Sequence, residues 1–318
     1  MDLTSYQTNF EEYLNQKNWI REPKNLYEPI EYIIQLSGKR IRPILTLMAA
    51  DILSGNFTKA LPAALAVEVF HNFTLVHDDI MDDAPLRRGK KTANIIWGNE
   101  FSVLAGDFLF AQSFELMVET GSIRALSSLA SASCKITQGE FQQMQIANKP
   151  NTTKVEYFDV IGKKTAELFG ASCESGIIVA NGSLAQQKAA YDYGFNLGLA
   201  FQIVDDLMDF SSQSKKMGKN LGDDFKLGKT TLPIILAWEK SNTSEKKFWD
   251  RTLRELKQYT GDFDEALNIF KKYNIFEECK LKAKEFVSKS KISLEQLPNT
   301  EFKEHLIGLA SESTQRSK

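Results

Sequence analysis

Residues 60–83 read ALPAALAVEVFHNFTLVHDDIMDD, an apolar stretch that ends in a cluster of four aspartates. The spacing of the apolar residues predicts a helix over residues 60–82. In this helix Asp78 and Asp82 lie one turn apart on the same face, where their negative charges repel each other. The negative end of the helix dipole adds to this repulsion. A bound cation is therefore needed to offset the charge of the cluster.

Residues 205–209 read DDLMD and repeat this arrangement at the end of a second apolar helix, predicted over residues 184–210. Ser183 and Gln186 have the spacing of a capping box at the start of that helix. Two such helix ends that face each other would bind divalent cations. Carboxylate ligation without His or Cys is typical of Mg²⁺, which completes its octahedron with water and substrate phosphates. A solvated acidic helix end is the alternative for a single cluster, but two clusters favour a metal site and a diphosphate substrate.

Helical periodicity continues through the rest of the 318 residues. Only 18 glycines and 8 prolines interrupt it, which is few for a β-sandwich with many turns. No linker or shift in composition divides the chain, so we expect one all-α domain over residues 1–318. Further helices are expected over residues 6–15, 26–36, 43–52, 100–119, 123–147, 154–179 and 232–240, and in the tail over 245–311.

The composition excludes several classes of protein. The 39 Lys and Arg residues against 41 Asp and Glu residues leave a formal charge of −2, which disfavours a nucleic-acid binder. Apolar residues make up 42% of the chain, enough for a large core, so disorder is excluded as the main state. The three cysteines form no CxxC pair, which fits a reduced, cytoplasmic protein without zinc or disulfides. Neither a secretory signal nor a membrane span is visible.

Basic residues cluster beside the acidic motifs. Residues 38–43, GKRIRP, precede a helix, and Pro43 suits the first helical position. The cations of this loop would reinforce an anion site at the helix N-terminus. Arg87 and Arg88 follow the first aspartate cluster, and Lys219 and Lys229 follow the second. Surface solubility explains any one of these pairs, but the joint arrangement favours diphosphate binding.

His71 lies seven residues before Asp78, about two helical turns, and therefore nearly on the same face. In that position it is able to donate a hydrogen bond to a phosphate in the same cavity. The alternative is a buried histidine that is satisfied by a backbone carbonyl.

Five segments together resemble the trans-isoprenyl diphosphate synthases, also called the polyprenyl synthetase family. They are GKRIRP (38–43), LVHDDIMDDAPLRRG (75–89), GKKTAELF (162–169), FQIVDDLMD (201–209) and GKNLGDDFKLGKTTLP (218–233), and they occur in the family's order and spacing. The resemblance extends from about residue 26 to residue 237. It implies a bundle of mostly antiparallel helices around a central active-site cavity, three Mg²⁺ ions per active site, and usually a homodimer.

The resemblance also implies roles for individual residues. The isopentenyl diphosphate group would be held by Lys39, Arg42, His71 and Arg88. The allylic diphosphate would be held by Arg87, Lys164, Thr165, Gln202, Lys219 and Lys229. The principal Mg²⁺ ligands would be Asp78, Asp82 and Asp205, with Asp79, Asp206 and Asp209 in support. The residues expected to act directly in catalysis are Asp78, Asp79, Asp82, Arg87, Lys164, Asp205, Asp206 and Lys219. The C-terminal Arg316 and Lys318 either fold over the site or belong to a frayed tail.

The implied reaction is a Mg²⁺-dependent condensation of isopentenyl diphosphate with dimethylallyl, geranyl or farnesyl diphosphate. Metal ions and basic side chains neutralise the charge on the departing diphosphate, and the isopentenyl double bond attacks the allylic cation that is left. Loss of a proton completes the step, and no protein nucleophile is needed. A class I terpene cyclase would carry a different second metal motif, and a non-catalytic subunit would have lost aspartates or arginines. Both alternatives are therefore disfavoured.

Product length in this family depends on the depth of the apolar pocket below the first aspartate cluster. Phe73 lies five residues before Asp78, about 7.5 Å along the helix axis, and Phe70 lies about one turn deeper. An aromatic residue at this position beside the small Thr74 resembles the members that make geranylgeranyl diphosphate, so we expect a C20 product. A C15 product and a longer product are the alternatives, and core packing is the alternative role of Phe73.

Overall fold

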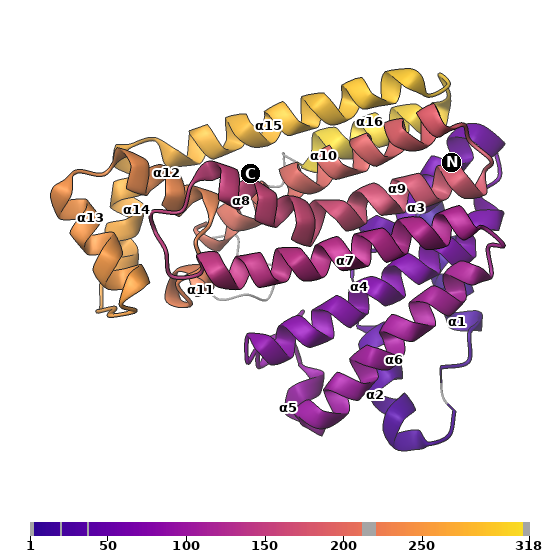
Figure 1. The fold of residues 1–318 in the computed structure, drawn as a ribbon, viewed down its shortest axis with the longest axis horizontal. Coiled ribbons are helices and arrows are strands. Elements are labelled where there is room, and N and C mark those ends of the chain that lie inside the picture. The colour runs from indigo at the N-terminus through magenta and orange to yellow at the C-terminus, as the bar shows by residue number, and fades with distance from the viewer. Residues whose placement is uncertain (1–2, 20, 37, 212–220, 314–318) are drawn as a thin grey trace. The chain divides into compact units, whose positions relative to one another are not determined.

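The protein is described by a computed structural model that covers residues 3–19, 21–36, 38–211 and 221–313. Most of these residues are helical (Figure 1). Within the described ranges the only strands are two short ones, β1 (Leu86–Arg87) and β2 (Lys90–Lys91), which pair antiparallel. The predicted all-α fold class is confirmed.

Figure 1 shows the order of the helices along the chain. In the first half they are α1 (Leu3–Gln16), α2 (Lys24–Gln35), α3 (Ile41–Ser54), the short η1 (Phe57–Ala60), α4 (Leu61–Met81), α5 (Ala93–Trp97), α6 (Asn99–Val118) and α7 (Ile123–Ile146). They continue with α8 (Lys154–Ile161), η2 (Gly162–Ala166), α9 (Glu167–Val179), α10 (Leu184–Asp209), α11 (Asp223–Lys226) and α12 (Leu232–Lys240). The last are α13 (Thr243–Trp249), η4 (Asp250–Arg254), α14 (Asp262–Lys272), α15 (Ile275–Ser293), η5 (Leu294–Gln296) and α16 (Glu301–Ser313).

The chain divides into two compact units, each assembled from three stretches. Unit 1 comprises Met1–Ser131, Leu168–Gly194 and Ser293–Ile307, and unit 2 comprises Ala132–Glu167, Phe195–Ile292 and Gly308–Lys318. The first aspartate cluster and the basic loop belong to unit 1, whereas the second aspartate cluster belongs to unit 2. The single domain expected from the sequence stays a prediction.

Helix α4 forms the centre of the core of unit 1. Pro62 lies in its first turn, where a missing N–H costs nothing, and residues 63–70 are all buried. The helix packs against α1, α2, α3 and α6. Gly106 of α6 permits a close approach to α4, because a Cβ atom there would lie 2.3 Å from His77 Nε2. Other helices cover α4 on several sides, which explains why almost all residues of this run are apolar.

Two helix starts test the expectations from the sequence. At α10 the capping box is confirmed, since the Ser183 N–H donates to Gln186 Oε1 at 2.8 Å and the Gln186 N–H donates to Ser183 Oγ at 3.3 Å. At α3 the expectation was wrong, because the helix begins at Ile41 and Pro43 is its third residue. Proline is tolerated there because the first four N–H groups of a helix have no partner within it.

Trp249 is the largest fully buried side chain in the core of unit 2. Its ring stacks on Phe270 at a centroid distance of 5.8 Å, and its Nε1 donates to Ser241 Oγ at 3.0 Å. Phe225 of α11 and Phe248 of α13 also contact this ring, at centroid distances of 6.5 Å and 5.0 Å. The predicted helical tail is confirmed as α13 to α16.

Helix α6 is the one helix in the described ranges that is long and apolar enough to cross a membrane by length and composition alone. It packs against α2, α4 and α5 within unit 1. Buried core helices meet the same criteria, so this finding is weak support for a span.

Candidate functional site

The first aspartate cluster, at the end of α4, contains carboxylates in different environments. Asp79 is buried, and Arg87 Nε lies 2.8 Å from both of its carboxylate oxygens. Asp78 is half-buried and Asp82 is exposed. Burial raises the pKa of Asp79, and the hydrogen bonds from Arg87 oppose this shift. The carboxylate of Asp79 is thus neutralised by Arg87.

A tight turn directs the two neighbouring arginines to different partners. Leu86 pairs with Lys91 and Arg87 with Lys90, and the turn residues Arg88 and Gly89 adopt positive φ angles of 53° and 77°. Two successive left-handed residues are typical of a two-residue hairpin turn. Arg87 therefore points back to Asp79, whereas Arg88 Nη1 donates to the Leu36 carbonyl oxygen at 2.9 Å.

The predicted isopentenyl residues of unit 1 come together around the loop before α3. The Arg88 guanidinium lies against Gly38, where a Cβ atom would be only 2.5 Å from Arg88 Nη1. Arg42 Nη1 lies 3.0 Å from His71 Nε2, and the Arg42 guanidinium stacks over the Phe169 ring at 4.5 Å. Lys39 is an exposed residue of the same loop.

His71 is held neutral in this cluster. Burial lowers its pKa well below the usual value, and the charges of Arg42 and Arg88 lower it further. A neutral imidazole can accept at Nε2, so Arg42 donates and His71 accepts. The histidine thus orients Arg42 in the protein as described, and phosphate binding by His71 stays a prediction.

Arg42 and Arg88 have no carboxylate partner among the described residues. Burial and, to a smaller extent, the charge of Arg88 lower the pKa of Arg42 to about 10, while the charge of Glu68 opposes this shift. Arg42 lies within the electrostatic reach of Arg88, and the two guanidinium groups form a site of concentrated positive charge. Such a site favours an anion, and planar guanidinium groups match the geometry of phosphate oxygens.

In unit 2 the second aspartate cluster lies in a hydrogen-bonded chain of side chains. Thr165 Oγ1 donates to Gln202 Oε1 at 2.8 Å, and Gln202 Nε2 donates to Asp206 Oδ1 at 2.8 Å. The Tyr157 hydroxyl donates to Asp206 Oδ2 at 2.6 Å. Burial, followed by the charge of Asp224, raises the pKa of Asp206 to about 7. Three residues predicted for the site are therefore joined, and Tyr157 orients them.

Lys164 lies in η2, a π-helical turn inside the α8–α9 helix. Its Nζ donates to Gln143 Oε1 at 2.6 Å and forms an ion pair with Glu140, both on α7. Such turns are rare and frequently lie at functional sites. Nothing in the spacing of Glu140, Gln143 and Tyr157 distinguishes them from ordinary helix residues, so the sequence does not predict their contacts with the site.

The remaining predicted residues of unit 2 have different environments. Lys229 follows Gly228, whose φ is 66°, and its N–H donates to the Asp224 carbonyl oxygen at 2.9 Å. Asp209 is buried, and its Oδ2 accepts from the Asp224 N–H at 3.1 Å. Asp205 is half-buried. Lys219, Arg316 and Lys318 lie outside the described residues.

The residues that the structure describes contain no group of three His, Cys, Asp or Glu side chains that could hold a metal on their own. The available donors are carboxylates in small groups on α4 and α10. This donor set fits Mg²⁺, which uses one or two carboxylates and takes its remaining ligands from water and substrate phosphates.

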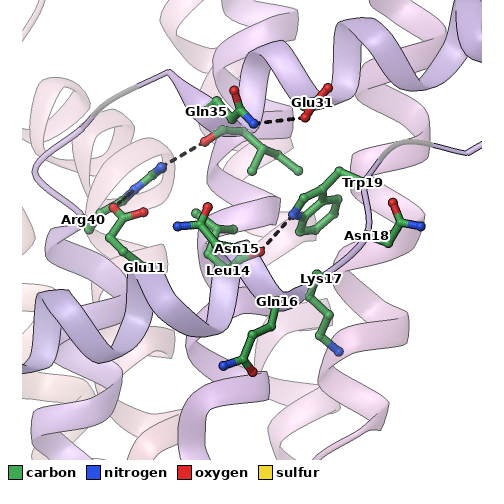
Figure 2. Close-up of a pocket in the computed structure, with 11 residues that line it drawn as sticks. Glu11, Leu14, Asn15, Gln16, Lys17, Asn18, Trp19, Glu31, Gln35 and Arg40 are labelled. Carbon is green, nitrogen blue, oxygen red and sulfur yellow. Dashed lines mark hydrogen bonds and ion pairs between the residues drawn. The ribbon is translucent and has the colours of Figure 1, made fainter.

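A cavity of about 540 Å³ lies beside the basic loop, between the end of α1 and α2 (Figure 2). Its lining includes Glu11, Trp19, Gln35 and Arg40. Of the residues 38–43 only Arg40 lines it, so this cavity is separate from the predicted substrate residues.

Comparison with known proteins identifies the family. The family model for polyprenyl synthetases matches residues 23–270. The chain belongs to the polyprenyl synthetase family. It is 39% identical to an octaprenyl diphosphate synthase of Haemophilus influenzae, over 90% of this chain and 87% of that protein. It is 35% identical to a geranylgeranyl diphosphate synthase of Saccharolobus solfataricus, over 86% of each chain.

A solved structure agrees with this assignment. A polyprenyl synthase from Caulobacter crescentus, complexed with calcium and isoprenyl diphosphate, superimposes with a TM-score of 0.92 at 38% identity, over 99% of this chain and 96% of that one. The predicted family and prenyltransferase activity are confirmed, and the polyprenyl synthetase family is metal-dependent.

Asp206→Asn should reduce the dependence of stability on pH. The pKa of Asp206 is raised from 3.8 to about 7 in the folded protein. Between these two pH values the folded chain therefore keeps a proton that the unfolded chain loses. The free energy of unfolding therefore falls as the pH rises from about 4 to about 7, by up to about 1.4 kcal/mol per pH unit from this group. Chemical denaturation in metal-free buffer at several pH values measures the slope.

The matched control for this prediction is Asp192→Asn, which removes a carboxylate paired with Lys188 on α10. It should keep the wild-type slope. Identical slopes for wild type and Asp206→Asn would show that Asp206 does not hold a proton in the fold.

Proposed function

We propose that this polyprenyl synthetase condenses isopentenyl diphosphate with an allylic diphosphate, namely dimethylallyl, geranyl or farnesyl diphosphate, in a Mg²⁺-dependent reaction that releases diphosphate. The observation that carries the proposal is the pair Arg42 and Arg88, two neighbouring guanidinium groups without a carboxylate partner in the described chain. A substrate with a diphosphate group supplies the missing negative charge.

The proposed substrate residues fall into two groups. Lys39, Arg42, His71 and Arg88 bind the isopentenyl diphosphate group, and Arg87, Lys164, Thr165, Gln202, Lys219 and Lys229 bind the allylic diphosphate. Two sets of contacts support this division. Arg42 contacts His71 in the first group, and hydrogen bonds link Thr165, Gln202 and Asp206 in the second.

The proposed metal ligands are Asp78, Asp82 and Asp205, for three Mg²⁺ ions. Asp79 is held by Arg87 and Asp206 by Tyr157 and Gln202, which suits supporting positions. Asp209 accepts from the Asp224 backbone and has the same supporting role. Bound Mg²⁺ supplies positive charge that stabilises the departing diphosphate.

The protein side chains contribute to the reaction in three ways. Lys164 and Arg87 neutralise charge on the allylic diphosphate as its C–O bond ionises. Arg42 and Arg88 hold isopentenyl diphosphate so that its double bond can attack the allylic cation. Apolar helix faces exclude the water that would otherwise react with the cation. A proton lost to the released diphosphate completes the step.

We propose a C20 product, with Phe73 as the floor of the apolar pocket. The Phe73 ring packs on Phe110 at a centroid distance of 5.0 Å and on Phe70 at 5.4 Å, so α6 holds it in place. Thr74 beside it is small and bonds its own helix through the His71 carbonyl oxygen at 2.8 Å. A longer product is the second candidate, favoured by the octaprenyl relative, and C15 is the third.

The active protein is proposed to be a cytoplasmic homodimer without a membrane span or a nucleic-acid partner. Exposed apolar side chains on α5 and α6, among them Ile95, Ile96, Phe101 and Leu104, support pairing with a second copy, since burial of such side chains stabilises an interface.

Purified protein incubated with Mg²⁺, isopentenyl diphosphate and each allylic diphosphate in turn should form a longer prenyl diphosphate, read as the dephosphorylated alcohol. Asp78→Ala and Asp205→Ala should each lower turnover by about 100-fold or more, because charge on the departing diphosphate is no longer stabilised. Glu285→Ala, which removes a carboxylate paired with lysines on α15, should retain full activity. Normal turnover in either aspartate variant would refute the metal-site assignment.

Phe73→Ala should lengthen the product by at least one five-carbon unit, because the pocket loses its floor. Phe57→Ala removes a buried ring that packs on Tyr6 instead, and should leave the product unchanged. Chromatography of the alcohols by chain length compares the three proteins. An unchanged product from Phe73→Ala would make Phe73 an ordinary core residue.

A further inference from the structure

Arg40 uses its guanidinium differently from the other cations of the basic loop. Its side chain is only 2% exposed. Nη1 lies 2.7 Å from Glu68 Oε1, Nε lies 2.9 Å from Glu11 Oε1, and Nη2 donates to the Ile34 carbonyl oxygen at 2.9 Å. One side chain thus joins α1, α2 and α4.

Arg40 and Arg42 contact different partners, although only Ile41 separates them. Arg40 has a φ of 47°, in the left-handed region, and α3 begins directly after it. Its guanidinium forms part of the wall of the cavity beside α1, where Figure 2 shows it next to Glu11. Arg42 instead contacts His71 and Phe169.

Glu68 is the carboxylate that links Arg40 to the proposed diphosphate site. Its side chain is 4% exposed, and it lies three residues before His71, on nearly the same face of α4. Burial lowers the pKa of Arg42 and of Arg88, and the charge of Glu68 opposes both shifts. The charge of Glu68 therefore raises the pKa of Arg40, Arg42 and Arg88, although of these three only Arg40 donates a hydrogen bond to it.

We infer that Arg40 is a positioning residue for isopentenyl diphosphate: by pairing with Glu68 and Glu11, it leaves Arg42 and Arg88 to bind the diphosphate group. This inference rests on the proposed function of that site. A buried carboxylate without a partner would attract Arg42 or Arg88 and compete with the substrate. Arg40 prevents this competition and never contacts the substrate.

A purely structural role of Arg40 makes different predictions. Loss of a link between three helices would lower stability and turnover with both substrates alike. The positioning role instead acts through the charge of Glu68, so that removal of this charge compensates for the loss of Arg40. Replacing both members of a buried ion pair is also much less destabilising than breaking it.

The test compares Arg40→Gln, Glu68→Gln and the double variant in steady-state assays with Mg²⁺. Arg40→Gln should raise KM for isopentenyl diphosphate by about tenfold or more, the effect of a lost charged hydrogen bond, while KM for the allylic substrate and kcat change by less than about twofold. The double variant should return to within about threefold of the wild-type KM. Glu68→Gln alone should not raise it.

Arg251→Gln is the matched control, since it breaks an ion pair with Asp262 in unit 2, with both contacts at 2.8 Å. It should leave both KM values unchanged. If Arg40→Gln does not fold, Arg40→Lys and the double variant are compared instead. Arg40→Lys keeps a positive charge beside Glu68, so both variants should stay within about threefold of the wild-type KM for isopentenyl diphosphate. Equal effects on both substrates, or no recovery in the double variant, would overturn the inference.

Calorimetric titration of isopentenyl diphosphate separates the failure of this inference from the failure of the proposed function. Wild-type protein that binds isopentenyl diphosphate without condensing it would contradict the proposed function, while the Kd values of the variants would still test Arg40. Wild-type protein that binds no isopentenyl diphosphate would overturn both.

Discussion

The pairing of arginine side chains with carboxylates is the constraint on which the rest of this structure depends. A guanidinium taken out of water needs an anion, and the fold supplies one to some arginines and not to others. Arg40 is matched by Glu68 and Glu11, and Arg87 by Asp79. Arg42 and Arg88 pair with no described carboxylate. These two guanidinium groups therefore remain available to an anion, and we propose that a diphosphate group binds there.

Much of this arrangement is predictable from the sequence, because its signals are local. Aspartates four residues apart at the ends of apolar helices predict a cation site, since helical geometry alone places them on one face. The capping box at Ser183 and Gln186 likewise depends only on neighbouring residues, and the structure confirms it. The few glycines and prolines and the helical periodicity were sufficient for the fold class.

Other features could not be predicted, because tertiary contacts determine them. Nothing in GKRIRP distinguishes the buried Arg40 from Arg42, and nothing in DDLMD shows that Asp206 receives hydrogen bonds from Tyr157 and Gln202. The start of α3 was misplaced by two residues, since proline fits any of the first helical positions. Product length is harder still to predict, because the pocket floor that we propose depends on how the rings of Phe70, Phe73 and Phe110 pack.

A crystal structure with isopentenyl diphosphate, Mg²⁺ and an unreactive allylic thiodiphosphate tests this account most directly. The account predicts isopentenyl diphosphate oxygens within hydrogen-bond distance of Arg42 and Arg88, metal ions on Asp78, Asp82 and Asp205, and Arg40 still bound to Glu68. A diphosphate bound at Arg40 in the cavity beside α1, or metal ions away from both aspartate clusters, would contradict it.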